Sequence, residues 1–567
     1  MPTRLQALAF RFKATCFRTK RTINELGKRP CRQNTTAVEA DAPILSESRS
    51  LLYPNQSSAE FALQAGKVHN LRIAAQHLNG IVLPAGETFS FWAHVPRPTS
   101  RQGFVAGREL REGCIIPSVG GGLCQLSNAL YDAALKADFE IVERHGHSRV
   151  LPGSMAESGK DATVFWNYVD LRFRTTADIQ FEVTLGRGEL VVRMRKIGDQ
   201  ELGQNSPSKS TRQNTPMPGD PVESCETCGV TSCFRHPEAM SLPSTSVTAW
   251  LVDAYWPEHD IYMSRTRSEQ DWLFTPMAGH RYHWHTDGFT EVKQARMAVI
   301  RRSIVSRKLA SQGAARQRAL LAMDEKLAQS FAKRTPYQAT HLVVSQNLLP
   351  FLWRDGLLGG RTFDVLMTRL PIKDLQASLD AAAARWPESP TLADFRVEQE
   401  LLDWETTALK EARHWITPHS EIARIAGDKA LKLDWYLPEA ESDVSQGDAV
   451  LFPASTLGRK GAWEMREIGG PVNLAGPILE SPDFWNGHDV NRTGFDLNGV
   501  GAVVLPAWSE HQPRRLLQAI ANDIPVIASK ACGLSGMQGV SEVEMGDVEA
   551  LKASVEAALN RSSEVTA

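Results

Sequence analysis

Apolar residues recur at helical and strand spacing along most of the chain. Residues 63–78 and 124–137 repeat apolar side chains at the spacing of one helix face, which predicts two amphipathic helices. Shorter apolar runs predict strands over residues 81–91, 140–143, 163–168, 169–173, 179–183 and 189–194, the first with a Pro-Ala-Gly turn inside it. Helices followed by several strands indicate an α+β unit.

A polar segment separates this unit from the second half of the chain. Residues 203–224 are rich in Ser, Thr, Pro, Asn and Gln and predict a linker. From residue 246 onward, strand-like runs alternate with longer helical ones, which favours a parallel-sheet α/β architecture. The clearest repeat is a strand over 499–505, a helix over 512–522 and a strand over 525–529. That order is typical of a parallel crossover.

These patterns divide the chain into five parts. We expect a basic extension over 1–45, an α+β domain over 46–200, a polar linker over 201–245 and two parallel-sheet domains over 246–437 and 438–560. A multidomain protein also fits the length of 567 residues, because a domain commonly holds about 100–200 residues.

Composition and charge exclude several classes of protein. The chain carries 63 Lys and Arg against 65 Asp and Glu, whereas nucleic acid as a main partner requires a strong basic field. Its longest nearly uncharged apolar run, near residues 499–508, is far shorter than the about 20 residues of a membrane span. Eight cysteines in so long a chain do not suggest a disulfide framework. We expect a soluble, reduced, cytoplasmic protein.

The first 32 residues differ in kind from the rest. They hold nine Lys and Arg against a single acid, interleaved with Leu and Phe. A basic amphipathic segment can lie on an anionic membrane surface, so we expect either a peripheral contact with the inner membrane surface or a solvated basic extension. The segment lacks the continuous apolar stretch of a secretory signal.

Three glycines lead directly into the second predicted helix. Gly120, Gly121 and Gly122 allow backbone N–H groups to converge at a helix N-terminus, where the helix dipole favours an anion. The next helical turn holds Cys124, whose thiol is expected to have a lowered pKa there. Histidines and acids follow farther along the chain at His145, His147, Asp161 and Asp170.

These residues admit three interpretations, which stay open on the sequence alone. In the first, Cys124 is a nucleophile, His147 or His145 its base, and Asp161 or Asp170 the group that orients the base. In the second, the glycine turn binds a phosphate or carboxylate. In the third, the glycines only shape a turn, the thiol packs as a small apolar group and the histidines bond locally.

A cysteine cluster follows the linker. Its spacing is C-x2-C-x4-C-x2-H, formed by Cys225, Cys228, Cys233 and His236. Four such ligands can surround zinc at about 2.0–2.3 Å, and a metal would help a segment with few apolar residues to fold. We expect a structural zinc site here or, failing that, a reduced, redox-sensitive hinge segment.

Several separated motifs resemble those of one bacterial family. They are KVHNL at 67–71, PAGETFSF at 84–91, GGGLCQLS at 120–127, ERHGHS at 143–148, and DATV at 161–164 with a later aspartate. Residues of about 45–200 thereby resemble the VanW family, which is associated with vancomycin-resistance clusters. The resemblance implies a cell-envelope context but no settled reaction.

The C-terminal half resembles the group 1 glycosyltransferases. A strand over 449–454 precedes Arg459 and Lys460, and the strand over 499–505 precedes Glu510, which is followed after seven residues by Gln518. The family signature is a glutamate, seven residues and a second glutamate. The resemblance covers about residues 246–560 and implies two Rossmann-like domains of the GT-B fold and retaining transfer from a nucleotide-sugar donor, with no cofactor required.

The resemblance also assigns roles to these residues. Glu510 would hold the donor sugar, Gln518 would hold the ribose in place of the family's glutamate, and Lys460 with Arg459 would neutralise the donor diphosphate. Glu510 and Lys460 are the catalytic candidates. The function expected is therefore transfer of a sugar to a cell-envelope-related acceptor. The alternatives are a non-catalytic protein that binds an envelope precursor or a nucleotide sugar, as Gln518 suggests, and an acyl-transfer enzyme that depends on Cys124.

Overall fold

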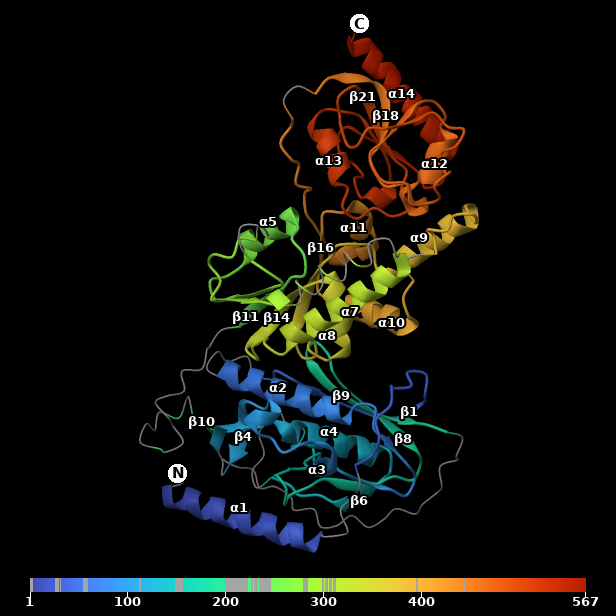
Figure 1. Ribbon diagram of the computed structural model, residues 1–567. Coiled ribbons are helices and arrows are strands. Elements are labelled where there is room, and N and C mark those ends of the chain that lie inside the picture. Colours follow the sequence, from blue (N-terminus) through green and yellow to red (C-terminus); the bar gives the residue numbers. More distant parts are fainter. Residues whose placement is uncertain are drawn as a thin grey trace. The chain divides into compact units, whose positions relative to one another are not determined.

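The computed structural model divides the chain into two compact units (Figure 1). Unit 1 comprises Met1–Val247, Pro336–His341 and Gly356–Thr362, and unit 2 comprises Thr248–Thr335, Leu342–Asp355 and Phe363–Ala567. The residues that the structure describes are 4–25, 30, 32–54, 60–111, 114–147, 155, 157–198, 223–225, 228, 233, 246–278, 284–297, 300, 304, 308, 313–393, 396–441 and 444–566.

Unit 1 is built on an antiparallel sheet covered by two helices. The strand order is β1-β9-β8-β2, with β1 at Ile44–Leu51, β9 at Glu189–Lys196, β8 at Ile179–Leu185 and β2 at Val82–Leu83. Helices α2 (Phe61–Leu78) and α4 (Leu123–Lys136) lie side by side and pack on this sheet (Figure 1). Their buried apolar faces and the sheet form one continuous core.

Two smaller sheets, the long helix α1 and two short helical elements complete unit 1. An antiparallel hairpin joins β4 (Ala106–Arg111) to β5 (Cys114–Val119), which also pairs with β10 (Glu223–Ser224). The third sheet has the order β3-β7-β6. The remaining bounds are β3 Thr88–Ser90, β7 Arg172–Arg174, β6 Glu140–Glu143, α1 Arg4–Asn24, α3 Phe91–His94 and η2 Ser100–Gln102.

Most elements predicted for this part of the chain are confirmed. Both helices begin and end within two residues of the predicted bounds, and β6, β8 and β9 lie where strands are predicted. The strand predicted over 163–168 is wrong. Its backbone finds partners outside any ladder, because Thr163 N donates to His145 O at 2.7 Å. Only an isolated bridge between Phe165 and Val169 remains.

Unit 2 begins with a seven-stranded sheet of the order β13-β12-β11-β14-β15-β16-β17. The pairs β11–β12, β12–β13, β15–β16 and β16–β17 are parallel. The strand bounds are β11 Val247–Leu251, β12 Trp272–Thr275, β13 Glu291–Gln294, β14 Ala339–Ser345, β15 Thr362–Leu366, β16 Trp415–Thr417 and β17 Ala430–Lys432. The helices are α5 Pro257–Thr266, α7 Gly313–Ala332, α8 Leu349–Arg354, α9 Ile372–Arg385, α10 Gln399–Glu411 and α11 Ser420–Ala426, with η3 Gln346–Leu348 and η4 Gly427–Lys429.

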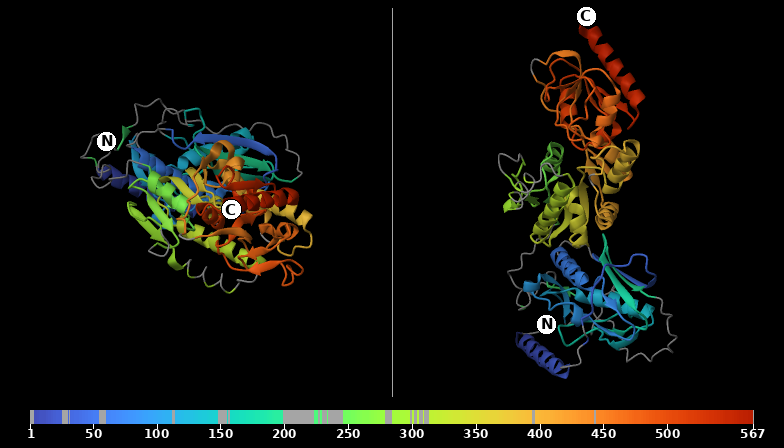
Figure 2. Two further views of the ribbon diagram at one scale, coloured as in Figure 1. Left: turned by 90° about the horizontal axis from the view of Figure 1, so that it is seen from above. Right: turned by 45° about the vertical axis from the view of Figure 1, so that its right-hand side comes forward.

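A second parallel sheet follows, of the order β20-β19-β18-β21-β22-β23. The strand bounds are β18 Gln446–Phe452, β19 Val472–Leu474, β20 Val490–Arg492, β21 Val500–Leu505, β22 Val526–Ser529 and β23 Val540–Val543. Its helical elements are α12 Ala462–Glu467, α13 Arg514–Ala521, α14 Val548–Thr566, η5 Gly458–Lys460 and η6 Lys530–Cys532. Helix α14 runs along one side of this sheet, as the right-hand view of Figure 2 shows.

The central strand of this second sheet, β21, has the burial that is typical of a parallel sheet. All six residues of β21 are buried, as expected for a strand covered by helices on both faces. The predicted strand–helix–strand crossover corresponds to β21, α13 and β22 and is confirmed. The predicted fold class is confirmed as well: a mixed α/β unit is followed by two Rossmann-like parallel sheets.

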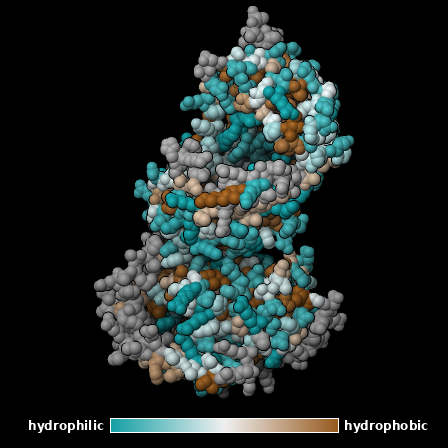
Figure 3. Space-filling view, in the orientation of Figure 1, coloured by the Kyte–Doolittle hydropathy of each residue, from teal (hydrophilic) through white to brown (hydrophobic). Residues whose placement is uncertain are grey.

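One face of the molecule shows how its polar and apolar side chains are distributed. Most side chains on the visible face are hydrophilic, with small hydrophobic areas between them (Figure 3). Within the described part of the chain, no helix has both the length and the apolar character needed to cross a membrane. A membrane contact through residues 1–32 stays a prediction that concerns α1, which exposes Phe12, Phe17 and Ile23.

Candidate active site

The glycine turn before α4 is shaped by close packing that excludes side chains. Gly120 and Gly122 have φ of 83° and 101°, in the left-handed region that favours glycine. A Cβ on Gly121 would lie 2.4 Å from Gly107 O, and one on Gly122 would lie 2.1 Å from Lys67 Cγ. The turn therefore brings the start of α4 directly against β4 and α2.

Cys124 lies in the first turn of α4, where backbone N–H groups have no acceptor within the helix. Its Sγ lies 3.5 Å from Thr163 Oγ1 and 3.9 Å from Val164 O. One turn along the same helix face, Ser127 donates to Ala162 O, and Asn128 Oδ1 accepts from Ala162 N at 2.7 Å. Helix α4 thus carries the thiol and also positions the segment after Asp161.

His147 and Asp161 form a tight pair beside this thiol. His147 Nδ1 lies 2.5 Å from Asp161 Oδ1, and the backbone N–H of His147 donates to Asp161 Oδ2 at 2.5 Å. Asp161 is only 1% exposed. Because its carboxylate occupies Nδ1, the imidazole has Nε2 left for the thiol of Cys124, with which it makes a side-chain hydrogen bond.

The electrostatics of the pair favour a thiolate and an imidazolium. Burial by itself raises the pKa of the Cys124 thiol, but the hydrogen bond and the positive charge of His147 outweigh burial and lower the pKa. Burial likewise opposes protonation of His147, yet hydrogen bonds to Asp161 and Cys124 raise its pKa to about 10. The cysteine, histidine and aspartate therefore have the arrangement of a nucleophile, a base and an orienting acid.

The other two candidates from the sequence lie elsewhere. His145 is largely exposed and its Nε2 lies 3.3 Å from Glu143 Oε1. Asp170 accepts from Ser90 Oγ at 2.6 Å and from Arg172 Nε at 2.9 Å. Of the alternatives left open by the sequence, the structure brings His147 and Asp161 to Cys124.

A cavity of about 910 Å³ opens over Cys124 within unit 1. Its wall is formed by the glycine turn, the β4–β5 hairpin, aromatic side chains and one side of α1. Residues that line it include Ala14, Arg18, Lys67, Trp92, Arg97, Arg108, Gly120, Gly121, Gly122, Cys124, His147, Thr163 and Trp166. A volume of this size lies within the about 300–1,000 Å³ of small-molecule sites.

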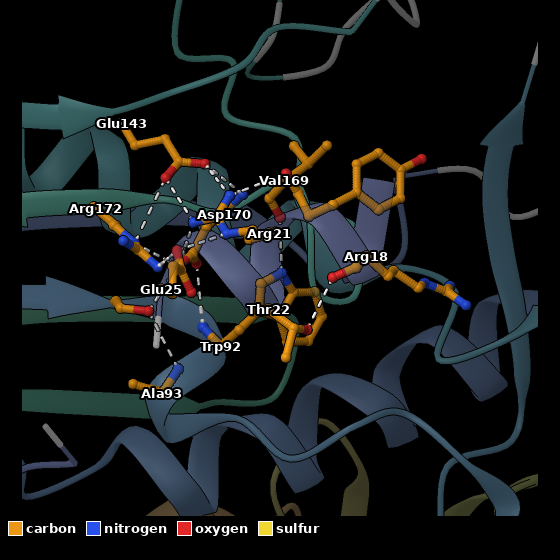
Figure 4. Close-up of polar contacts among 12 residues, drawn as sticks. Arg18, Arg21, Thr22, Glu25, Trp92, Ala93, Glu143, Val169, Asp170 and Arg172 are labelled. Atoms are coloured by element: carbon orange, nitrogen blue, oxygen red, sulfur yellow. Dashed lines mark hydrogen bonds and ion pairs between the residues drawn. The ribbon is translucent and has the colours of Figure 1, made fainter. Parts of the chain in front are cut away.

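Helix α1 is held in place beside the cavity by ion pairs (Figure 4). Arg21 binds Glu143 through two hydrogen bonds of 2.6 and 2.7 Å, and Arg172 binds Glu25 at 2.6 Å. Asp170 lies between the two arginines. Burial opposes ionisation of Glu143, but hydrogen bonds, from His145 and Arg21 first, lower its pKa to about 2. The basic N-terminal segment is therefore a folded wall of the cavity.

A second cluster lies at the carboxyl ends of β18 and β21, where ligands commonly bind parallel sheets. Lys460 Nζ lies 2.8 Å from Glu510 Oε2 and donates to Ser509 O at 3.0 Å. Burial raises the pKa of Glu510, but the charge of Lys460 outweighs it, so that the pKa is lowered. A Cβ on Gly461 would lie 2.3 Å from Pro506 O, so glycine is needed for the two loops to meet.

The two remaining donor-site candidates are placed differently. The backbone carbonyl of Arg459 accepts from the N–H groups of Trp508 and Ser509 at 3.0 and 3.1 Å, so its loop lies against the one that carries Glu510. Gln518 lies on α13 and its amide donates to Glu441. The structure brings Lys460, Arg459 and Glu510 into one cluster, and it turns Gln518 toward the segment before β18.

The predicted zinc ligands are described only in part. Cys225, Cys228 and Cys233 are among the described residues, whereas His236 lies outside them. Within the described part of the chain, no group of three or more metal-ligating side chains is close enough to hold a metal ion. The zinc site stays a prediction.

Three residues of the thiol site were missed by sequence reasoning. Lys67, Thr163 and Asn128 touch the glycine turn, the thiol and the backbone of Ala162. Two of them lie inside the motifs KVHNL and DATV. Those motifs therefore carried a signal, but only the packing of α2 and α4 assigns each side chain its neighbour.

Residues 66–195 match the family model described as "VanW like protein". Vancomycin B-type resistance protein VanW of Enterococcus faecalis is 31% identical over 156 residues, which are 27% of this chain and 57% of the relative. Uncharacterized protein YoaR of Bacillus subtilis is 36% identical over 106 residues, 19% of this chain and 34% of the relative. The chain thus spans about half or less of the length of these relatives.

Among solved structures, sucrose-phosphate synthase from Thermosynechococcus elongatus is similar with a TM-score of 0.36 and 14% identity. The match covers 56% of this chain and 91% of that protein. The description of unit 2 as two Rossmann-like sheets rests on its own strand order and parallel pairing.

Proposed function

Residues 66–195 are a VanW-like domain, and we propose that this domain is a thiol-dependent acyl-transfer enzyme. The observation that carries the proposal is the hydrogen-bonded series of Cys124, His147 and Asp161 at the base of a cavity. A thiol that merely packs in a core needs neither an imidazole partner nor a buried carboxylate behind that imidazole.

The chemistry follows from the geometry. The Cys124 thiolate attacks the acyl carbon of a substrate, and the oxyanion that forms lies against the N–H groups of the first turn of α4. The imidazolium of His147 then protonates the leaving group as the carbon–leaving-group bond breaks, which leaves an acyl thioester on Cys124. Next, His147 takes a proton from water or an amine, which attacks the thioester and releases the thiolate. Asp161 orients the imidazole throughout.

Acylation with simple thioesters tests this proposal. The full chain is incubated with a panel of N-acetylcysteamine thioesters, and the adduct is located by peptide mass spectrometry. We expect one acyl group on Cys124, no adduct in Cys124→Ala, and acylation at least about 100-fold slower in His147→Ala. Cys114→Ala is the matched control, because Cys114 lies on the nearby hairpin and should leave the adduct unchanged. Equal labelling of several cysteines, or no effect of His147→Ala, would contradict the proposal.

A second function is favoured by a separate observation in unit 2. We propose that the Lys460–Glu510 cluster binds a nucleotide-sugar donor and transfers its sugar with retention to a cell-envelope-related acceptor, without a metal cofactor. Support comes from the 2.8 Å ion pair at the carboxyl ends of two adjacent parallel strands. In this proposal Lys460 and Arg459 neutralise the leaving diphosphate, Glu510 holds the sugar and Gln518 the ribose.

Nucleotide release tests the second function. The chain is incubated with uridine-, guanosine- and adenosine-diphosphate sugars, and free nucleotide diphosphate is measured. We expect one donor to release nucleotide diphosphate, and we expect Lys460→Ala and Glu510→Ala each to abolish that release. Lys552→Ala, at an exposed pair on α14, is the control. Without release but with thermal stabilisation by a donor, unit 2 binds without turnover. With neither, the assignment fails.

Location and further partners belong to the same proposal. A cytoplasmic protein at the inner membrane surface, held there by the basic face of α1, would meet both nucleotide sugars and envelope precursors. Nucleic acid is not among its proposed partners, because the formal net charge is only −2. Metal analysis of the purified chain, compared with Cys225→Ser, tests the structural zinc.

A further inference from the structure

The wall of the Cys124 cavity carries more positive than negative side chains. Six lysines and arginines line it, namely Arg18, Arg49, Lys67, Arg97, Arg108 and Arg111, whereas the carboxylate on the wall is Glu109. Three of these cations have carboxylate partners. Arg49 binds Glu47, Arg108 binds Glu60 and Arg111 binds Glu109. The other three are described with no ion pair among the residues that the structure covers.

Lys67 is the deepest of these three. It is 6% exposed, lines the cavity, and lies directly behind Gly122 at the start of α4. Within the described part of the chain its ammonium makes no hydrogen bond or ion pair, because Glu60 binds Arg108 instead. Burial and the charge of Arg108 lower the pKa of Lys67 to about 7, although the charge of nearby Glu60 opposes the shift. A buried cation is costly when the carboxylate near it is already bound by an arginine, so this position is prepared for an anion.

Arg18 and Arg97 are two further positive charges on the same wall, and they lie near each other. Burial lowers the pKa of Arg18, and the nearby charge of Arg97 lowers it further. Arg18 Nε donates to the backbone carbonyl of Trp166 at 2.6 Å, and its guanidinium lies over the ring of Phe165. Neither contact neutralises its charge. Two unlike elements, α1 and the loop after α3, thus each contribute a cation that has no ion pair with another described residue.

We propose that this cavity selects acyl substrates that carry a negatively charged group, which Lys67 binds beside the glycine turn and toward which Arg18 and Arg97 draw the substrate. The inference rests on the proposed thiol function and names its substrate class. The N–H groups of the first turn of α4 remain available for the oxyanion. The proposal requires an anionic group on the substrate, and this group is either a carboxylate or a phosphate.

Two alkylating reagents of similar size separate charge selection from catalysis. Iodoacetate is anionic and iodoacetamide is neutral, and both alkylate a thiolate without any acyl chemistry. For Cys124 we measure the rate of alkylation by iodoacetate divided by the rate of alkylation by iodoacetamide. We compare this ratio with the same ratio for glutathione in the same tube. We expect Cys124 to favour iodoacetate at least tenfold, and we expect the preference to shrink as salt screens the cations. A ratio equal to that of glutathione would overturn the proposal.

Two variants assign the preference to named residues. Lys67→Met and the exposed Arg97→Gln should each lower the iodoacetate preference about threefold or more. Lys196→Met on β9 removes a cation outside the cavity and should leave the ratio as in the wild type. If Lys67→Met does not fold, Arg97→Gln still decides the matter. An unchanged ratio in every folded cavity variant would overturn the assignment.

Acyl probes distinguish the source of the charge and separate this inference from the proposed function. Three thioesters are compared. The succinyl thioester carries a free carboxylate, its methyl ester carries no charge, and the phosphonoacetyl thioester carries a phosphonate. Faster acylation of Cys124 by the succinyl probe than by its methyl ester identifies a carboxylate, and faster acylation by the phosphonate probe identifies a phosphate. Acylation of Cys124 at equal rates by all three would overturn the inference and keep the proposed function. No acylation alongside an iodoacetate preference would overturn the proposed function and leave only a preference of the cavity for anions.

Discussion

At the scale of single residues, the state of one thiol depends on two neighbours from distant parts of the sequence. His147 supplies a positive charge to Cys124, and Asp161 holds that charge on the imidazole. The buried carboxylate accepts from the ring and from the backbone of the same histidine, which fixes the ring in one orientation. The reactivity of the thiol is therefore a property of three side chains.

The pH dependence of alkylation follows from this coupling. Because His147 lowers the pKa of Cys124, iodoacetamide should react with Cys124 faster at neutral pH than with an unassisted thiol. In His147→Ala the midpoint of the pH–rate curve should rise to about 8.5 or higher, the range of an unassisted thiol. The curve of Cys16 on α1 serves as the internal reference. Identical curves for Cys124 in both proteins would disprove the coupling.

Asp161→Asn tests the orienting role separately. The amide cannot stabilise the imidazolium as the carboxylate does, so the pKa of His147 should fall from about 10 toward its ordinary range. Acylation of Cys124 should slow at least about 100-fold. Proton-resolved NMR titration of His147 provides a readout that a merely structural role of Asp161 would not change. Asp170→Asn, at the base of α1, is the comparison variant.

At the scale of elements, α4 and α1 have different roles around the cavity. Helix α4 carries the thiol on its first turn and positions the segment 161–164 through Ser127 and Asn128. Helix α1 closes one side of the cavity, and its attachment depends largely on charge. An element held by ion pairs responds to the loss of one charge more than an element packed in a core.

Removing the carboxylate of Glu143 should loosen α1. Glu143→Gln loses the paired hydrogen bonds to Arg21, worth about 1–2 kcal/mol for a partly exposed charged contact. Hydrogen exchange of the α1 amides should become about tenfold faster. Glu140→Gln, which breaks an exposed ion pair on the same strand, should change α1 exchange little. Equal effects of both variants would contradict the assigned attachment.

Acid should have a related effect on Glu143, and the sign can be worked out. Its pKa is about 2 in the folded protein, below the ordinary 4.5, so its contribution to stability is complete above pH 4.5. The contribution is lost as the pH falls from about 4.5 to about 2. The protection factors of the α1 amides, which correct for the pH dependence of intrinsic exchange, should fall across that window in the wild type, and less so in Glu143→Gln.

At the scale of the whole molecule, the chain holds two compact units with separate cores. The thiol, the cavity and α1 lie entirely in unit 1, and the Lys460–Glu510 pair lies entirely in unit 2. Each proposed reaction can therefore be tested by variants in one unit, with the readout of the other unit as a control.

Truncations in the two cores should act on different unfolding transitions. Leu126→Ala removes a fully buried side chain on α4, and Val503→Ala removes one on β21. The leucine truncation should cost about 2–5 kcal/mol and lower the transition of unit 1, whereas the valine truncation should lower that of unit 2. Calorimetry of the full chain measures both. A single transition lowered equally by both variants would show that the units unfold together.

Local patterns predicted much of the fold because the buried faces of its elements repeat regularly. The helices over Phe61–Leu78 and Leu123–Lys136 and the crossover around β21 follow directly from apolar spacing. The strand predicted over 163–168 is wrong for a reason that spacing cannot reveal. The backbone N–H of Thr163 donates to His145 O, and that of Ala162, just before the predicted strand, donates to Asn128; both partners come from other segments.

The sequence by itself determined the residue types, the glycine turn and the thiol at the start of a helix, because these depend on neighbours along the chain. It left the base open between His145 and His147, and the acid between Asp161 and Asp170. Tertiary packing decided both. Helix α4 positions the backbone after Asp161, whereas Asp170 binds the arginines that hold α1. Only that packing left Lys67 buried behind Gly122 with no ion pair to another described residue, because burial and charge pairing are properties of assembled elements.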